Sequence, residues 1–226
     1  MDREMTPPRF AALIPAAGSG SRLGFGIPKA LVDLQGKTLL ERAIENLAPL
    51  VDEVVVALPE GQSIESPVKQ IVGGNTRQDS VFRLLQATEA DFVLIHDAAR
   101  PFLGAKVLER IKGRVIQSGA VTAALPATDT LVHSSGGFWG YLVDRSKTWA
   151  VQTPQAFRRT LILDAHLKAL QEGFEATDDA GLANKYGSNV ELVLGDSRLF
   201  KVTTPADFEL ATAFAQLWDQ KRSTPS

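Results

Sequence analysis

The feature that most constrains the fold is an alternation of short, continuously apolar runs with amphipathic segments along most of the chain. Such runs are typical of parallel strands buried on both faces, and the amphipathic segments between them indicate helices that cover a sheet. Strands are predicted at residues 10–14, 54–58, 92–96, 121–125 and 190–194. The pattern predicts an α/β fold with a Rossmann-like, mostly parallel sheet flanked by helices.

Two segments carry start signals for helices. Thr38 precedes Glu41 by three positions, the spacing of a capping box, and Pro205 follows Thr204 at the position where proline favours a helix start. The first helix should bury Leu39, Leu40, Ala43, Ile44 and Leu47. The second should cover the sheet with Phe208, Leu210, Ala211, Phe214 and Leu217.

Length and composition limit the function. The 226 residues fit a single domain, 1–226, and the formal net charge of -2 argues against a nucleic-acid or membrane-surface binder, which usually carries a basic excess. No apolar run approaches the ~20 residues that span a bilayer. The absence of cysteine excludes disulfides, thiolate metal sites and a cysteine nucleophile. A cytoplasmic protein is expected.

Residues 128–151 differ in composition from the rest of the chain, being rich in Thr, Ser, Gly and aromatic residues. Alternation around Gly136-Gly137 predicts a β-hairpin arm that projects from the sheet. Exposed aromatic residues on such an arm favour a partner surface, and a homodimer is predicted.

A glycine-rich stretch follows the first predicted strand, where an α/β fold presents main-chain amides to a phosphate. The spacing of Gly18, Gly20 and Gly24 is one position too long for a dinucleotide fingerprint, and Leu31 stands where a Walker loop needs glycine. Alone, the stretch fits a phosphate loop and a tight strand-to-helix connection equally well. Arg22 and Lys29 add two cations that can hold a triphosphate.

Together, residues 16–24 and 28–30 resemble the signature of the nucleotide-sugar pyrophosphorylase-like nucleotidyltransferases, and specifically of the 2-C-methyl-D-erythritol 4-phosphate cytidylyltransferase family. Further segments match that family in order, so that the resemblance spans roughly residues 10–210. They are G-G-x-x-R-x-x-S-V at 73–81, H-D-A-A-R-P at 96–101, D-T at 129–130, D-R at 144–145, T-P-Q at 153–155, T-D-D-A at 177–180 and K-V-T-x-P-x-D at 201–207.

The resemblance implies transfer of CMP from CTP to 2-C-methyl-D-erythritol 4-phosphate, with release of pyrophosphate, in non-mevalonate isoprenoid biosynthesis, and Mg²⁺ as cofactor. It implies catalytic roles for Arg22, Lys29, Arg145 and Lys201. Asp97 ends a predicted strand beside the glycine-rich loop, a position suited to a metal or ribose contact. The implied nucleotide contacts are Pro15, Ala16, Ala17, Gly18, Ser19, Gly20, Gly74, Asn75, Arg77, Ser80, Asp97 and Ala98. The implied contacts to the second substrate are Arg100, Thr130, Thr153 and Thr177, and Arg145 comes from the partner subunit of the dimer.

Several simpler interpretations stay open. Residues 73–81 and 177–180 also fit ordinary helix caps, and Arg145 fits a solvated charge. Structural or solvated roles are expected for all three histidines, and packing roles for Trp139, Trp149 and Trp218.

Two positions depart from the family pattern. Ala30 replaces a common Gln, and Arg198-Leu199 replaces an acidic or Asn pair, which puts part of the polyol contacts in doubt. Alternative functions are a cytidylyltransferase for another polyol phosphate such as ribitol 5-phosphate, a non-catalytic nucleotide-binding module and, remotely, a dehydrogenase.

Overall fold

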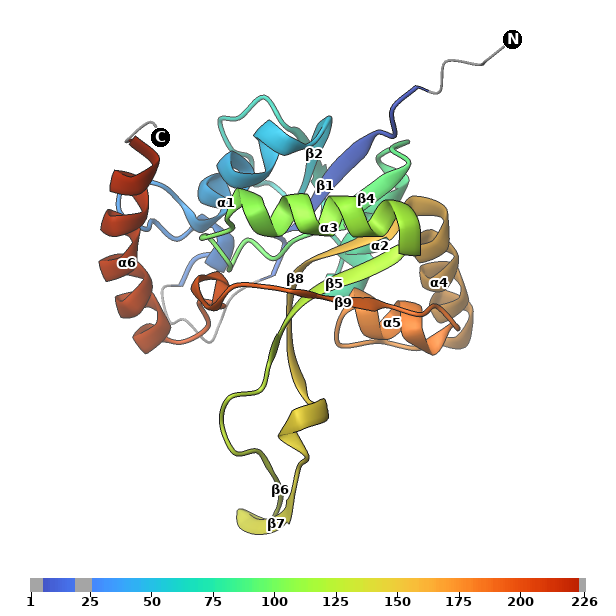
Figure 1. The fold of residues 1–226 in the computed structure, drawn as a ribbon. Helices are drawn as coiled ribbons and strands as arrows, with labels where there is room; N and C mark the ends of the chain where they lie inside the picture. The colour runs from blue at the N-terminus through green and yellow to red at the C-terminus, as the bar shows by residue number, and fades with distance from the viewer. Residues whose placement is uncertain (1–5, 19–25, 224–226) are drawn as a thin grey trace.

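The computed structural model describes residues 6–18 and 26–223. Within them, seven strands form one sheet in the order β3-β2-β1-β4-β8-β5-β9, and Figure 1 shows this sheet at the centre of the molecule. Only β8 runs antiparallel to its neighbours in this sheet. The strands are β1 Phe10–Pro15, β2 Glu53–Leu58, β3 Lys69–Val72, β4 Phe92–Ile95, β5 Ala120–Pro126, β8 Trp149–Arg158 and β9 Glu191–Leu194. The predicted mostly parallel α/β sheet is confirmed.

Helices cover both faces of the sheet, and successive residues of β1 point to opposite faces. Phe10, Ala12 and Ile14 pack with α1 and α3, whereas Ala11 and Leu13 pack with α2, α4 and α5. The helices are α1 Leu39–Leu47, α2 Arg77–Gln86, α3 Ala105–Ser118, α4 Arg159–Glu172, α5 Asp179–Lys185 and α6 Pro205–Ser223. Short 3₁₀ turns are η2 Lys29–Leu31, η3 Ala48–Leu50, η4 Arg145–Lys147 and η5 Ser197–Leu199.

The five predicted strands are confirmed, but β3 and β8 were not predicted. β3 is a short edge strand with no fully buried residue, so it lacks a strong apolar signal. β8 lies inside the sheet and nevertheless buries the polar side chains of Gln152, Thr153 and Gln155. A buried strand with several polar residues does not produce the continuous apolar run on which the prediction depended.

The two predicted helix starts are confirmed, but the residues predicted to be buried by the second helix are partly wrong. The Thr38 hydroxyl accepts from Glu41 N at 3.1 Å, and the Thr204 hydroxyl accepts from Asp207 N at 3.2 Å. All five apolar residues predicted for α1 are buried. In α6, however, Leu210 and Leu217 are more than half exposed, because a narrower stripe centred on Ala211 and Ala215 makes the contact.

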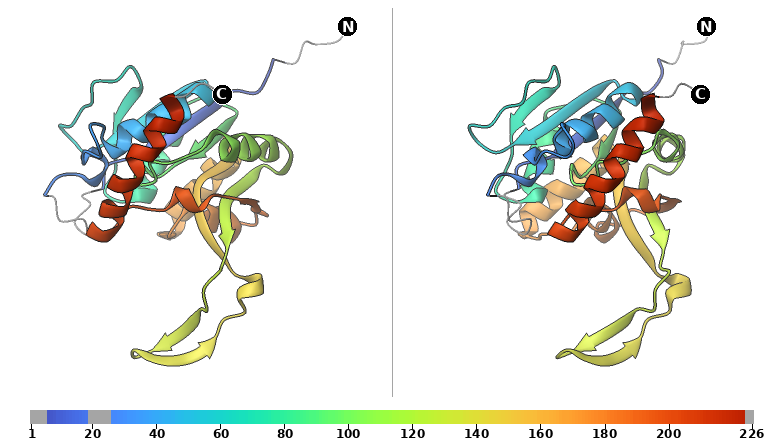
Figure 2. Two further views of the ribbon diagram at one scale, coloured as in Figure 1. Left: turned by 60° about the vertical axis from the view of Figure 1, so that its left-hand side comes forward. Right: turned by 90° about the vertical axis from the view of Figure 1, so that its left-hand side faces the viewer.

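Helix α6 does not cover the sheet as predicted. It packs on a separate cluster beside the sheet, formed with residues of the connecting segments and of α1, and Figure 2 shows it along one side of the body. The cluster contains Val32, Leu34, Leu39, Phe102 and Val202.

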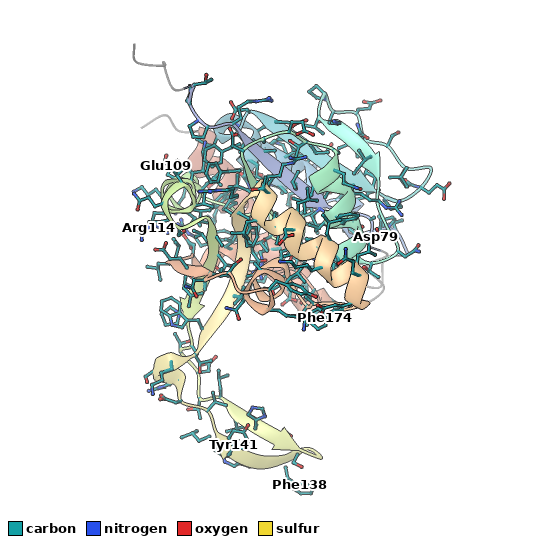
Figure 3. All side chains as sticks on the ribbon, turned by 90° about the vertical axis from the view of Figure 1, so that its right-hand side faces the viewer. Asp79, Glu109, Arg114, Phe138, Tyr141 and Phe174 are labelled. Atoms are coloured by element: carbon teal, nitrogen blue, oxygen red, sulfur yellow. The ribbon has the colours of Figure 1, made fainter. Side chains whose placement is uncertain are left out.

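The predicted arm is present. Strands β6 Val132–Ser135 and β7 Phe138–Leu142 pair in a hairpin whose turn places Gly136 and Gly137 at φ values of 58° and 85°. The views in Figures 1 and 2 agree that the arm extends away from the body. Phe138 and Tyr141 lie toward its far end in Figure 3 and are 80% and 64% exposed. Trp139 is 70% exposed, so the packing role expected for it is wrong within one chain.

Among the helices in the described ranges, none has the length and apolar content needed to cross a membrane.

Candidate functional site

The strand order reverses at β1, because the chain continues from β1 to β2 on one side and later returns to β4 on the other. In an open α/β sheet, the carboxyl ends of strands at such a point form a ligand-binding crevice. A cavity of about 230 Å³ lies there, lined by residues that follow β1 and β4, by the start of α2 and by Lys29 and Lys201.

A larger cavity, of about 490 Å³, lies between α6 and the ends of α1 and α3. Its walls are mostly apolar, with Leu50, Leu103, Phe214 and Trp218 among them, and it lies away from the strand ends. The smaller cavity is the better candidate for chemistry because charged side chains converge on it.

Most of the predicted nucleotide contacts and two of the predicted catalytic residues meet at the smaller cavity. They are Pro15, Ala16, Ala17, Gly18, Lys29, Gly74, Asn75, Arg77, Ser80, Asp97, Ala98 and Lys201. Ser19, Gly20 and Arg22 lie outside the described residues. The cavity also includes Ala30, Thr76 and Ala99, which were not predicted as contacts.

Thr153 is buried and does not line the cavity, and the four remaining predicted residues in the described chain lie elsewhere. Arg145 and Thr130 are on the exposed arm, where Arg145 Nη1 donates to the main-chain oxygen of Thr128 at 3.2 Å. Thr177 is exposed just before α5. Arg100 follows β4, and its Nη1 donates to the oxygen of Leu199 at 2.8 Å. None of these four residues lines the cavity formed by the described part of this chain.

The Gly73-Gly74 turn explains why the predicted motif needs glycine. A Cβ at Gly73 would lie 2.3 Å from the Ala17 side chain, and one at Gly74 would lie 1.9 Å from Asp79 Oδ2. Gly74 N donates to Ser80 Oγ at 3.0 Å, and Thr76 caps α2 by accepting from Asp79 N. The segment is therefore both a helix cap and a wall of the cavity.

Asp97 is the centre of the charge arrangement. Its Oδ1 pairs with Arg77 Nε at 3.2 Å and its Oδ2 with Lys201 Nζ at 2.7 Å. Burial alone would raise the pKa of Asp97, but Arg77, Lys201 and Arg100 more than offset this and hold the pKa well below its usual value. Asp97 is therefore an ionised carboxylate at the cavity wall.

Thr153 and His96 form a buried hydrogen-bonded chain that holds the main chain of Asp97. Thr153 is buried, and its hydroxyl accepts from Asp97 N at 3.0 Å and bonds to His96 Nδ1 at 3.0 Å. Burial lowers the pKa of His96 to about 4, so the ring is neutral at neutral pH. The Thr153 hydroxyl then donates to Nδ1, and Nε2 donates to the oxygen of Arg100 at 3.1 Å. The structural role expected for His96 is confirmed.

Sequence reasoning missed a second carboxylate at Arg77. Asp179, the first residue of α5, pairs with Arg77 Nη1 at 2.7 Å and with His166 Nε2 at 3.2 Å. The T-D-D-A motif contained this residue, but Thr177 was the only member of the motif predicted as a contact. Asp178 caps α5 by accepting from Gly181 N at 2.8 Å. A second acid beside a cap, with no role in the cap itself, was the available signal.

The two departures from the family pattern have simple structural consequences. Ala30 is buried in the cavity wall. Arg198 pairs with Asp196, whereas the Leu199 side chain is fully buried and its main-chain oxygen accepts from Arg100. The main chain at Leu199 thus holds Arg100, whereas its side chain packs in the core.

Comparisons with known proteins agree with the motifs. A family model described as 2-C-methyl-D-erythritol 4-phosphate cytidylyltransferase matches residues 10–216. A protein of that name from Deinococcus radiodurans is 59% identical over 91% of this chain and 89% of its own length. The crystal structure of the enzyme of that name from Thermus thermophilus has a TM-score of 0.84 and 40% identity, covering 92% of this chain and 99% of the other. The chain therefore belongs to the 2-C-methyl-D-erythritol 4-phosphate cytidylyltransferase family.

Proposed function

We propose that this chain transfers CMP from CTP to 2-C-methyl-D-erythritol 4-phosphate, releasing pyrophosphate, in non-mevalonate isoprenoid biosynthesis. The observation that carries the proposal is the cavity at the ends of β1 and β4, which Lys29, Lys201 and Arg77 line, the last two pairing with the ionised carboxylate of Asp97. Family membership supports the proposed reaction, and the charged lining of the cavity supports the roles proposed for its residues.

The reaction joins two polyanions, so it needs cations more than a nucleophile. A phosphate oxygen of the polyol substrate attacks the α-phosphorus of CTP, and the bond to the bridging oxygen of pyrophosphate breaks. Lys29 neutralises the charge that develops at the α-phosphate, with Arg22 as the proposed second cation. Lys201 also lines the cavity, where its partly exposed side chain pairs with Asp97 and can position the incoming phosphate. The attacking phosphate is already ionised, so no general base is needed.

Mg²⁺ fits this site as cofactor. Asp97 is the carboxylate among the described lining residues, and Mg²⁺ commonly takes one or two carboxylates together with substrate phosphates. When bound, the ion neutralises the triphosphate and polarises its phosphorus centre. Arg77 and Thr153 hold the carboxylate and the main chain of Asp97 in place for that role.

The arm supplies the proposed contacts from a second copy. Arg145 and Thr130 are exposed on the arm and do not line the described cavity of their own chain. The arm also exposes Phe138, Trp139 and Tyr141, an apolar surface that monomers rarely leave uncovered. A homodimer that buries these side chains can bring Arg145 and Thr130 to the partner's polyol phosphate, beside Arg100 and Thr177.

The test of the activity is pyrophosphate release from CTP and Mg²⁺ with each of two acceptors. We expect release with 2-C-methyl-D-erythritol 4-phosphate and little with ribitol 5-phosphate. The reverse preference would contradict the proposed acceptor, and no release with either would favour the non-catalytic nucleotide-binding module.

The test of the dimer is light scattering at the concentration of the assay, which should give the mass of two chains. Replacing Phe138, Trp139 and Tyr141 together with Ser should give one chain. A monomeric wild-type protein would contradict the proposed dimer. We further propose that the enzyme is cytoplasmic and binds neither nucleic acid nor membrane, as its net charge and lack of cysteine suggest.

A further inference from the structure

Arg77 is held at the cavity from two sides by carboxylates of different elements. Nε pairs with Asp97, which follows β4, and Nη1 pairs with Asp179, which begins α5. The two ion pairs leave Nη2 outside them, while the side chain keeps 31% of its surface exposed and lines the cavity. The two ion pairs therefore fix the plane of the guanidinium group at the cavity wall.

The carboxylate of Asp179 is buried, which is energetically costly. Its side chain is only 2% exposed, and a buried carboxylate is costly unless its oxygens are paired. Burial alone would raise the pKa of Asp179, but Arg77 and the hydrogen bond from His166 lower it, so the group is ionised. An ionised carboxylate only accepts, so His166 Nε2 carries a proton and donates to Oδ1 at 3.2 Å.

His166 is itself fixed. It lies on α4 with its side chain 1% exposed, and its ring stacks on Phe82 of α2 with 6.2 Å between ring centroids. The donor nitrogen cannot turn to water without leaving this stack. The ring therefore connects α4 to the helix that carries Arg77.

The main chain around Asp179 is also held by side chains. Gln155 of β8 accepts from Ala180 N at 2.9 Å and donates to Asp178 at 2.7 Å. Gln78 of α2 accepts from Ala176 N at 2.8 Å and donates to the oxygen of Phe174 at 2.9 Å. These bonds fix the start of α5 against both β8 and α2, so the position of the Asp179 carboxylate depends mainly on its two partners.

We infer that His166 and Asp179 are positioning residues that hold Arg77 in the orientation in which it binds the nucleotide. Neither residue lines the cavity, so both act through Arg77. The inference rests on the proposed function, because the nucleotide contact of Arg77 is part of that function. Without the His166 donor, one oxygen of a buried carboxylate loses its partner, and Arg77 is held firmly only by Asp97, which Lys201 also engages.

The experiment compares His166→Phe, which keeps a ring on Phe82 but removes the donor, with His166→Gln, whose side-chain amide can restore it. We expect His166→Phe to raise the KM for CTP about tenfold, the size expected for one hydrogen bond to a charged group, with kcat and the KM for the polyol phosphate within about twofold. His166→Gln should return the KM for CTP to within about threefold. Asp179→Asn provides a second variant if His166→Phe does not fold.

A spectroscopic measurement tests the inference without a measurement of activity. The ¹⁵N NMR signal of Arg77 Nε, assigned by its loss in Arg77→Lys, should be sharp in the wild type, broadened in His166→Phe and sharp again in His166→Gln. An unchanged Arg77 signal in His166→Phe and Asp179→Asn would overturn the inference. So would variants that lower kcat and thermal stability while leaving the KM for CTP unchanged. A sharp signal in an enzyme that does not use CTP would instead contradict the proposed function and leave the positioning of Arg77 established.

Discussion

The cavity and the arm both lie next to the central sheet, but they differ in whether their side chains find partners within one chain. At the cavity, Asp97, Arg77 and Asp179 form a charge network in which each member has a partner within this chain. On the arm, Phe138 and Trp139 are largely exposed within this chain. The difference indicates that these charges of the cavity are satisfied within one chain, whereas the exposed aromatic side chains of the arm are suited to contact with another molecule.

The largest expected contrast comes from making the same substitution in the body and on the arm. Phe102 is 1% exposed among Phe200, Phe214 and Trp218, and Phe102→Ala should lower the free energy of unfolding by about 3–5 kcal/mol. Phe138 is 80% exposed, and Phe138→Ala should change it by less than about 0.5 kcal/mol. Urea denaturation at a concentration too low for association measures both. Equal losses would mean that the arm is packed within its own chain.

The next effect concerns catalysis at the cavity. Lys29→Ala should reduce kcat about a hundredfold to a thousandfold, because it removes one preorganised cation from the reacting phosphate. Lys37→Ala is the matched control, since Lys37 makes an exposed ion pair with Glu45 beyond the cavity. We expect the control to keep kcat within about twofold while both variants unfold at the wild-type temperature. A Lys29→Ala enzyme of normal activity would contradict the role proposed for Lys29.

These contrasts also explain what the sequence could predict. Buried strands such as β1 carry continuous apolar runs, and helix starts such as Thr38 carry a local spacing, so both were found. Strand β8 was missed because its buried Gln152, Thr153 and Gln155 are polar, and their burial depends on partners that come from distant segments. Local patterns do not contain that information.

Prediction of the site from the sequence is limited in the same way. Short motifs identified most residues of the cavity, whereas the pairing of Arg77 with Asp179 spans 102 positions and could not be derived from spacing. The net charge of -2 likewise gave no sign that Lys29, Arg77 and Lys201 line one cavity. Composition averages over the whole chain, and function here depends on where the charges meet.

The pH dependence of stability should also distinguish the two regions. The folded pKa of His96 is lowered from 6.5 to about 4, so the unfolded chain binds more protons between these values. The stabilisation is complete above pH 6.5 and is lost as the pH falls toward 4, a decrease of about 3 kcal/mol. The free energy of unfolding, measured by denaturation at about pH 7 and at about pH 4.5, should show most of this decrease. His96→Asn should remove most of this slope, and His133→Gln, on the exposed arm, should retain it; the opposite result would place the titrating group on the arm.

The smallest expected effect decides whether the arm acts on its own cavity or on a partner's. Arg145→Ala should raise the KM for the polyol phosphate about tenfold, because one charge-assisted contact is lost, and Lys147→Ala in the same 3₁₀ turn should have little effect. Neither change should alter the free energy of unfolding by more than about 0.5 kcal/mol, since both side chains are exposed.

Mixing Arg145→Ala chains with Lys29→Ala chains then separates the two arrangements. If Arg145 acts across a dimer, a mixed dimer contains one site with both residues intact, and activity at low polyol phosphate rises above that of either variant alone. If Arg145 acts within its own chain, every site lacks one of the two residues, and mixing restores nothing. If Arg145 acts across the dimer, the exposure of the arm has a simple reason, because its residues reach a cavity only when two chains associate.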